Sequence, residues 1–87
     1  MYFPEHSQIF VKRMKKLAKK DHLRFERLEK KMEEIVQDPN HYKPLGNILA
    51  GVQRVHLDPF ILTFRVDEQR KAVIFLDFEH HDKAYKN

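Results

Sequence analysis

The sequence predicts an α+β fold in which a short N-terminal strand and a helical hairpin are followed by a three-stranded antiparallel meander. Apolar residues recur with the helical period of about 3.6 in the first half of the chain, and with the strand period of about 2 after residue 51. Between these patterns stands Asp38-Pro39-Asn40, which ends the helical part because proline cannot continue a helix. No repeat or linker divides the chain, so we expect a single domain spanning residues 1–87.

The N-terminal strand is predicted to be short, because Pro4 is a turn signal that leaves only residues 1–3 for it. Ser7 then stands where the N-cap of a helix should stand. The apolar stripe of this helix consists of Phe10, Val11, Met14, Leu17 and Ala18, and the rest of its surface carries Lys12, Arg13, Lys15, Lys16, Lys19 and Lys20. We therefore expect a basic amphipathic helix of about four turns.

A second helix is expected directly after the first, with Asp21 ending one helix and capping the next. Its apolar stripe consists of Phe25, Leu28, Met32, Ile35 and Val36. The tight connection predicts two antiparallel helices that cover one face of the sheet.

The first strand of the meander is predicted from Gly51 to Leu57. Arg54 and His56 would project together from one face of this strand, because side chains two residues apart point the same way. After a reversal at Asp58-Pro59, the second strand would face the core with Phe60, Leu62, Phe64 and Val66, and the opposite side with Ile61, Thr63 and Arg65.

The third strand is the apolar run from Ala72 to Phe78, which is long enough to be central in the sheet. If the strand continues, Asp77, Glu79 and His81 share one of its faces.

The composition narrows the class of protein. The chain has 17 basic and 13 acidic residues, a formal net charge of +4, and residues 7–37 hold most of the excess. A polyanionic partner is therefore the first kind to consider. The absence of cysteine excludes a disulfide-stapled scaffold, and no apolar run reaches the roughly 18 residues of a membrane span. We expect a soluble cytoplasmic protein.

Histidines in the second half of the chain are the most chemically suggestive residues, because imidazole exchanges protons near neutral pH. They are His41, His56, His80 and His81. His56 stands between Arg54, which can hold a phosphate, and Asp58, which can orient an imidazole. The plainer alternative is that these are exposed histidines on polar turns.

Other features also allow two interpretations. His80 and His81, with His56, Asp77 and Asp82, could ligate zinc, but adjacent strand residues point to opposite faces, so we expect no metal site. The lysine-rich helix is either a nucleic-acid surface or a solvated face. Tyr85 could stack on a base or close the core.

Four segments carry a resemblance to a known family. They are Lys43-Pro44-Leu45, Gly51-Val52-Gln53-Arg54-Val55, the aromatic-rich strand that follows, and the end of the chain from Phe78 to Tyr85. In this order and spacing, the chain resembles the RelE/ParE superfamily of toxin–antitoxin toxins over almost its whole length. The segment from Arg54 to Leu62, together with His81-Asp82-Lys83-Ala84-Tyr85, is most similar to the YafQ-like branch.

The resemblance implies a metal-independent endoribonuclease that cleaves messenger RNA on the ribosome, uses no cofactor and is silenced by an acidic antitoxin. The substrate's 2′-OH would attack the adjacent phosphate. The residues implied are His56 and His81 for proton transfer, Asp58 to orient His56, Tyr85 to orient or stack on the nucleotide, Lys43 and Arg54 to hold the phosphate, and Arg65 and His80 as further substrate contacts. The basic helix, through Lys12, Lys15, Lys16 and Lys19, and the exposed sheet face would contact the antitoxin.

The chain departs from the family pattern at Ile61 and Glu79, where arginines are common, and the loop after Pro59 is one residue shorter than in the YafQ-like branch. Three alternatives therefore stay open. The chain could be a ParE-like toxin that acts on a DNA topoisomerase, a non-catalytic binding module, or a catalytically decayed member of the family.

Overall fold

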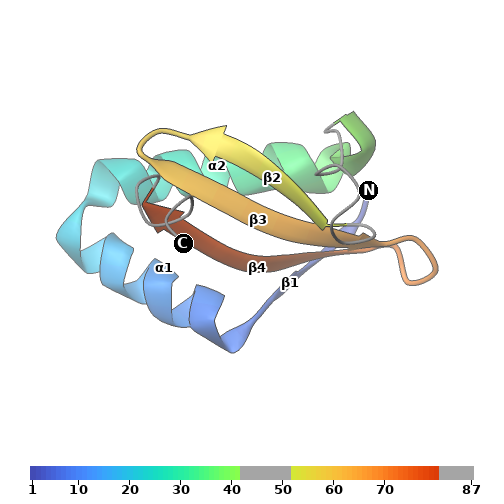
Figure 1. The fold of residues 1–87 in the computed structure, drawn as a ribbon, viewed down its shortest axis with the longest axis horizontal. Coiled ribbons are helices and arrows are strands. Elements are labelled where there is room, and N and C mark those ends of the chain that lie inside the picture. Colours follow the sequence, from blue (N-terminus) through green and yellow to red (C-terminus); the bar gives the residue numbers. More distant parts are fainter. Residues whose placement is uncertain (42–51, 81–87) are drawn as a thin grey trace, which may run out of the picture.

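Two helices packed on one face of a four-stranded sheet make up the computed structural model (Figure 1). The structure describes residues 1–41 and 52–80. In chain order the elements are β1 (Phe3–His6), α1 (Gln8–Lys20), α2 (His22–Gln37), a short 3-10 helix (Pro39–His41), β2 (Val52–Leu57), β3 (Phe60–Asp67) and β4 (Ala72–His80). The predicted order of one strand, two helices and three strands is confirmed.

The strands lie in the order β1-β4-β3-β2. The β2–β3 and β3–β4 pairs are antiparallel, as the predicted meander requires, and β4 is central, as its length and apolar character indicated. β1 runs parallel to β4 and forms one edge of the sheet. The sheet is therefore mixed, with its single parallel pair at that edge.

β1 runs through Pro4, so the prediction that the strand ends at Phe3 was wrong. Phe3 donates its backbone N–H to the carbonyl of Lys71 at 2.7 Å, and Ser7 donates to that of Phe75 at 3.0 Å. In a parallel pair, every second residue of an edge strand forms backbone hydrogen bonds to the neighbouring strand, and the backbone groups of the residues between them point outward. The backbone nitrogen of Pro4 therefore faces the open edge of the sheet. Proline is tolerated there because no ladder hydrogen bond requires its missing N–H.

Both predicted helix caps are present. Ser7 Oγ accepts a hydrogen bond from the backbone N–H of Phe10 at 3.1 Å, and Asp21 Oδ1 accepts one from that of Arg24 at 3.1 Å. α2 ends at Gln37, directly before the predicted stop. Within residues 1–41 and 52–80, no helix has both the length and the apolar character that crossing a membrane requires.

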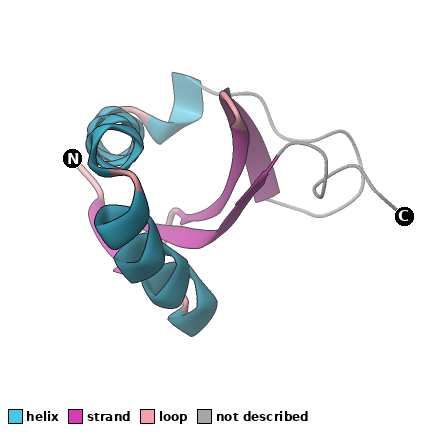
Figure 2. Ribbon diagram, turned by 90° about the vertical axis from the view of Figure 1, so that its left-hand side faces the viewer, coloured by secondary structure: helices cyan, strands magenta, loops and turns pink. Residues whose placement is uncertain are grey.

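The core lies between the helices and the inner face of the sheet (Figure 2). Its buried members are Phe10, Leu17, Leu28, Met32, Ile35 and Val36 from the helices, and Val55, Leu62, Phe64, Val73, Phe75 and Phe78 from the strands. The rings of Phe10 and Phe75 stack with centroids 5.6 Å apart, which joins α1 to β4. The outer face of the sheet is the side without helices, and it is the face seen in Figure 1.

A bulge in β4 decides which residues reach that outer face. Thr63 pairs with Asp77 and Phe64 pairs with Phe75, so Leu76 is an extra residue between the two pairs. In a regular strand, Asp77 would share a face with Phe75 and point toward the core. The extra residue turns Asp77 to the outer face.

Candidate functional site

Polar side chains of β2 lie on the outer face of the sheet. Arg54 and His56 are exposed there, while Gln53 and Val55 are buried, as the alternation predicted. Two rows of paired residues cross this face from β2 to β4. The rows are Arg54, Thr63 and Asp77, and His56, Ile61 and Glu79. We call these six residues the outer-face site.

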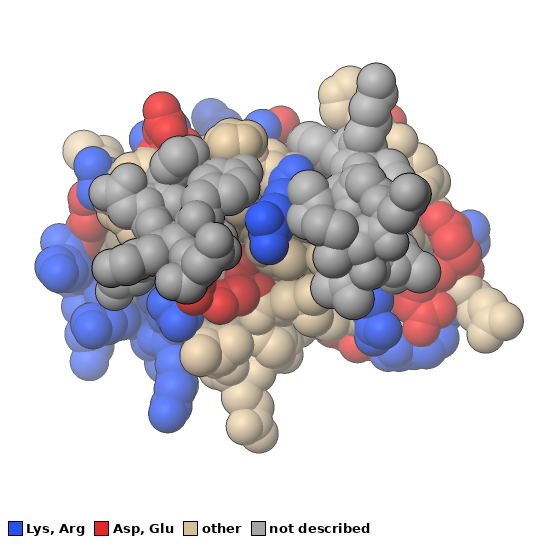
Figure 3. All heavy atoms as spheres, viewed as in Figure 1, with Lys and Arg blue, Asp and Glu red and all other residues tan. Residues whose placement is uncertain are grey.

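A hollow of about 190 Å³ lies in the outer-face site. It is lined by Arg54, Ile61, Thr63, Asp77 and Glu79. Figure 3, which looks onto this face, shows basic and acidic side chains side by side in its open part. Neighbouring strands are about 4.8 Å apart, so Arg54 and Asp77, two strands from each other, flank the same small space.

Arg13 of α1 approaches the two carboxylates of this site. Its Nε lies 2.9 Å from Asp77 Oδ1, and its Nη2 lies 3.6 Å from Glu79 Oε1. β1 pairs with β4 only as far as Phe75, and α1 packs against β4. The arginine therefore reaches the acidic end of β4 from the helix side and offsets part of its negative charge.

Asp77 is held in an unusual electrostatic environment. Burial raises its pKa above the ordinary value, and this effect outweighs the opposing attraction of Arg13. The backbone N–H of Phe78 donates to Asp77 Oδ1 at 2.8 Å and also lowers the pKa, whereas the negative charge of Glu79 raises it. A carboxyl group that keeps its proton to a higher pH than usual is better suited to proton transfer near neutrality.

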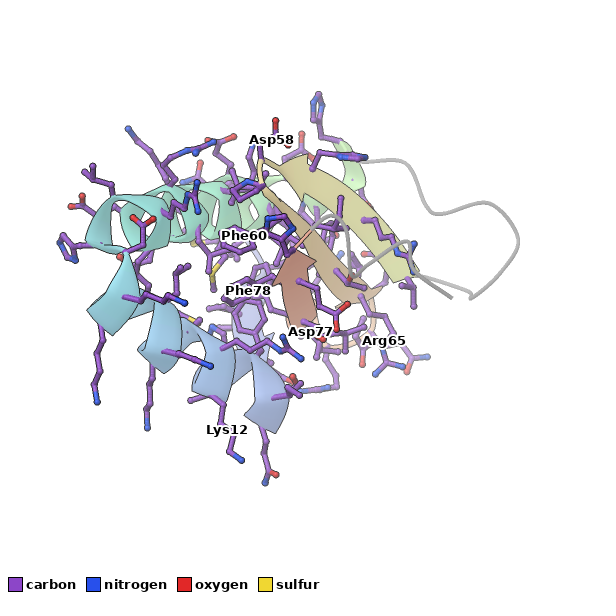
Figure 4. The ribbon with its side chains drawn as sticks, turned by 60° about the vertical axis from the view of Figure 1, so that its left-hand side comes forward. Lys12, Asp58, Phe60, Arg65, Asp77 and Phe78 are labelled. Atoms are coloured by element: carbon purple, nitrogen blue, oxygen red, sulfur yellow. The ribbon has the colours of Figure 1, made fainter. Side chains whose placement is uncertain are left out.

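Two further predicted residues lie near the outer-face site. Arg65 projects from β3 two residues beyond Thr63, on the same face. Asp58 lies in the turn between β2 and β3, where its backbone carbonyl accepts a hydrogen bond from Arg27 Nη1 at 3.2 Å. Figure 4 shows Asp58 at the hairpin end of the sheet and Arg65 well away from it.

His80 lies on the other face of the sheet. It pairs with Phe60, and the two rings meet edge to face with centroids 6.3 Å apart. Glu79, its neighbour in β4, belongs to the outer-face site. The structure thus brings Arg54, His56 and Arg65 to one face and turns His80 away from them.

Three predicted site residues lie outside the described part of the chain. They are Lys43, His81 and Tyr85. Their roles remain predictions.

Sequence reasoning did not assign Arg13, Asp77 or Glu79 to the site. The expectation that Asp77 and Glu79 share a face is confirmed, but the pattern could not say which face it is. Arg13 borders the apolar stripe of α1, since it follows Phe10 by three residues and precedes Leu17 by four. That position was the available signal that its side chain lies next to the sheet.

Metal ligands do not gather in the described residues. Among residues 1–41 and 52–80, no group of three or more histidine, aspartate or glutamate side chains is arranged to hold a metal ion. The chemistry that the described site offers is a guanidinium that can bind an anion, with an imidazole and a carboxyl that can exchange protons.

Comparisons with known proteins agree on one family. A family model described as "ParE toxin of type II toxin-antitoxin system, parDE" matches residues 6–85. The curated protein "Putative toxin RelE4" of Methanocaldococcus jannaschii is 48% identical over 87 residues, which is 99% of this chain and 93% of the relative.

Solved structures share the fold at low sequence identity. The toxin in the intact E. coli RelBE toxin–antitoxin complex is 20% identical, with a TM-score of 0.75, over 92% of this chain and 96% of the other. The match in the E. coli DinJ-YafQ complex is 22% identical, with a TM-score of 0.74, over 99% of this chain and 100% of the other.

Proposed function

The chain belongs to the RelE/ParE superfamily of toxin–antitoxin toxins, and from this membership we propose that it is an endoribonuclease that cleaves messenger RNA on the ribosome. The observation that carries the proposal is that Arg54 and His56 project together from one exposed face of β2, beside the hollow of the outer-face site. An arginine that can hold a phosphate next to a proton carrier is what RNA cleavage by the 2′-OH requires. The proposal requires a cytoplasmic protein, because its substrate is a message under translation.

The mechanism needs a base for the 2′-OH, an acid for the leaving 5′ oxygen, and cations for the charge that develops on the phosphate. His56 and His81 are the proposed proton carriers, with Asp58 orienting His56. Asp77, whose pKa burial raises, is an additional candidate for proton transfer.

The phosphate would be held by Arg54 and Lys43, with Arg65 as a further contact on the same face. His80 lies on the other face of the sheet and would contact the substrate away from this phosphate. Tyr85 would orient the nucleotide or stack on it. Ile61 is 1% exposed and pairs with His56 and with Glu79, so the middle of the second row supplies no charge. The cations proposed for the phosphate are therefore Arg54 of the first row, Arg65 and Lys43.

The test is cleavage of ribosome-bound message by the purified toxin, read by primer extension. We expect His56→Ala and His81→Ala each to lower the rate by about 10²- to 10⁴-fold, the usual cost of losing a general acid or base. His22→Ala, which removes an exposed histidine of α2, is the matched control. Wild-type rates in both site variants would refute the assignment.

No step of this chemistry uses a metal ion, so toxin that is treated with EDTA and freed of the chelator before it is added to the ribosomes is expected to cleave at an unchanged rate. Activity that disappears with EDTA and returns with zinc would show that the histidines are ligands, and the mechanism would have to be abandoned.

An acidic antitoxin is the proposed partner. The solved relatives include a RelBE and a DinJ-YafQ complex, and α1 presents five exposed lysines to such a partner. They are Lys12, Lys15, Lys16, Lys19 and Lys20, and basic side chains gather at this corner in Figure 3. Co-purification with the product of the adjacent reading frame tests this. No acidic partner there, together with no growth arrest on expression, would argue against a toxin.

A second candidate function is inhibition of a DNA topoisomerase, which the match to a ParE family model favours. A supercoiling assay with gyrase, run beside the message-cleavage assay, separates the two. Inhibited supercoiling with intact RNA would identify a ParE-like toxin, and no effect in either assay would indicate a decayed member or a binding module.

A further inference from the structure

A larger cavity lies on the helix side of the sheet, where α1 meets α2 at the ends of β3 and β4. Its volume is about 410 Å³, within the usual range for small-ligand sites. The lining residues that matter here are Lys16, Lys20, Arg24, Phe60, Phe78 and His80. We call it the helix-end pocket. Figure 4 shows Phe60 and Phe78 in the opening between the two helices and the sheet.

The pocket carries positive charge that its own carboxylates do not balance. Arg24 Nε lies 3.4 Å from Asp21 Oδ2, and Arg13 is shared between carboxylates of β4. Lys16 and Lys20, one helical turn apart on α1, form no ion pair with a carboxylate of residues 1–41 or 52–80. Two ammonium groups at the rim therefore favour an anionic ligand.

The floor of the pocket is aromatic. The rings of Phe60 and Phe78 meet edge to face with centroids 5.5 Å apart, and His80 approaches Phe60 in the same manner. The guanidinium carbon of Arg24 lies 6.0 Å from the centre of the Phe60 ring. Aromatic rings beside cations are the combination by which proteins hold single-stranded nucleic acid, since bases stack on the rings and phosphates bind the cations.

The helix-end pocket adjoins the outer-face site at the end of β4. Glu79 lines both cavities, and Arg13 lines the pocket while it pairs with Asp77 of the other site. A single strand of RNA that lies along Glu79 would therefore touch both. Because the outer-face site is the proposed site of RNA cleavage, this proximity favours RNA over an acidic peptide as the occupant.

We propose that the helix-end pocket binds one nucleotide of single-stranded RNA, with the base against Phe60 and His80 and a phosphate on Lys16 and Lys20. The choice of RNA rests on the proposed function. The pocket is a binding site beside the scissile phosphate, and none of its residues is assigned a proton-transfer step.

The test measures binding of a short fluorescent 2′-O-methyl oligoribonucleotide to the full chain freed of its antitoxin. This probe lacks the 2′-OH nucleophile and therefore reports binding without cleavage. The double variant Lys16→Glu/Lys20→Glu is compared with Lys12→Glu/Lys19→Glu, which changes the charge of the same helix equally, outside the pocket. Figure 4 shows Lys12 directed away from the opening.

We expect the pocket variant to bind at least about tenfold more weakly than the control variant, and its log–log salt slope to be smaller by about 0.7 for each phosphate that the lysines no longer neutralise. Phe60→Leu should weaken oligonucleotide binding by about fivefold or more, the loss of one stacked base, and leave binding of inorganic phosphate unchanged. Circular dichroism checks that Phe60→Leu remains folded.

Equal losses in the two lysine variants would overturn the inference, because net charge alone would then explain them. Normal oligonucleotide binding with impaired antitoxin binding in the pocket variant would also overturn it, by assigning the pocket to a protein. If the wild type fails to cleave but the pocket variant still binds more weakly than the control, the pocket stands and the nuclease proposal fails. If His56→Ala abolishes cleavage while the two lysine variants bind the oligonucleotide equally well, the nuclease proposal stands and the pocket proposal fails.

Discussion

At Asp77, two opposing effects act on one carboxyl group. Arg13 Nε lies 2.9 Å away and favours the ionised form, yet burial favours the protonated form more strongly, and the pKa is raised. Glu68, which is exposed, shows the opposite result. Its Oε1 accepts a hydrogen bond from the Tyr2 hydroxyl at 2.7 Å, and this contact, with Lys71 nearby, lowers its pKa.

These two carboxyls predict opposite dependences of stability on pH. The raised pKa of Asp77 means that the contribution of this carboxyl to stability is present below the ordinary pKa of aspartate, about 4, and is lost as pH rises through the raised pKa. Asp77→Asn should therefore gain stability relative to wild type as pH rises above about 4. The lowered pKa of Glu68 means that its contribution is present above the ordinary pKa and is lost as pH falls. Glu68→Gln should therefore lose stability relative to wild type as pH rises through the lowered pKa toward the ordinary pKa of glutamate.

Urea unfolding at a series of pH values measures both differences. For each variant, the difference in unfolding free energy from wild type is plotted against pH. The sign of this slope is the result that matters, since the two variants remove the same kind of charge. Slopes of the same sign would contradict the opposite environments of Asp77 and Glu68.

At the scale of the element, α1 is fixed to the sheet through Ser7. Its Oγ accepts from the Phe10 N–H at 3.1 Å and donates to the carbonyl of Leu76 at 2.6 Å. The second bond attaches the start of the helix to the bulge of β4. One hydroxyl thus orients both the helix that carries Arg13 and the strand that carries Asp77.

We expect Ser7→Ala to lower the free energy of unfolding by about 2 kcal/mol, about 1 for the missing cap and about 1 for the second hydrogen bond. Asp21→Ala, which removes the cap of α2, is the comparison and should cost about 1 kcal/mol. Thermal unfolding of the two variants shows which substitution costs more stability. A cost for Ser7→Ala no greater than that for Asp21→Ala would show that the bond to Leu76 adds nothing.

For the whole molecule, stability depends on a small aromatic core. Phe10 is fully buried, stacks on Phe75 and meets Phe78 edge to face at 5.4 Å. Replacing a buried phenylalanine by alanine costs about 3 to 5 kcal/mol, which is comparable to the whole stability of a domain of this size.

Phe10→Ala is therefore expected to be largely unfolded when purified alone, and to fold when co-expressed with the antitoxin, because a ligand of the native state shifts the equilibrium toward it. Phe3→Ala, at a side chain that is 71% exposed, is the control and should unfold close to wild type. Circular dichroism of each variant, alone and in complex, provides the measurement. Cooperative unfolding of isolated Phe10→Ala near the wild-type temperature would contradict the prediction.

Local patterns were sufficient for most of the fold. The change of period after residue 51 separated the helices from the meander, Ser7 and Asp21 marked the caps, and the alternation around Arg54 and His56 assigned them to one face. Each of these features is determined by residues within about four positions along the chain, because helix caps and the spacing of side chains on a helix or strand are local properties.

Only the tertiary structure decided how the strands and the site are assembled. The sequence pattern could not foresee that β1 pairs in parallel with β4 and passes through Pro4, because pairing between distant segments has no local signature. The bulge at Leu76 turns Asp77 and Glu79 outward, and Arg13 then reaches them from another element. Side chains alternate along a strand, so a single inserted residue exchanges its two faces, and whether one is inserted is determined by pairing with β3 and packing against α1.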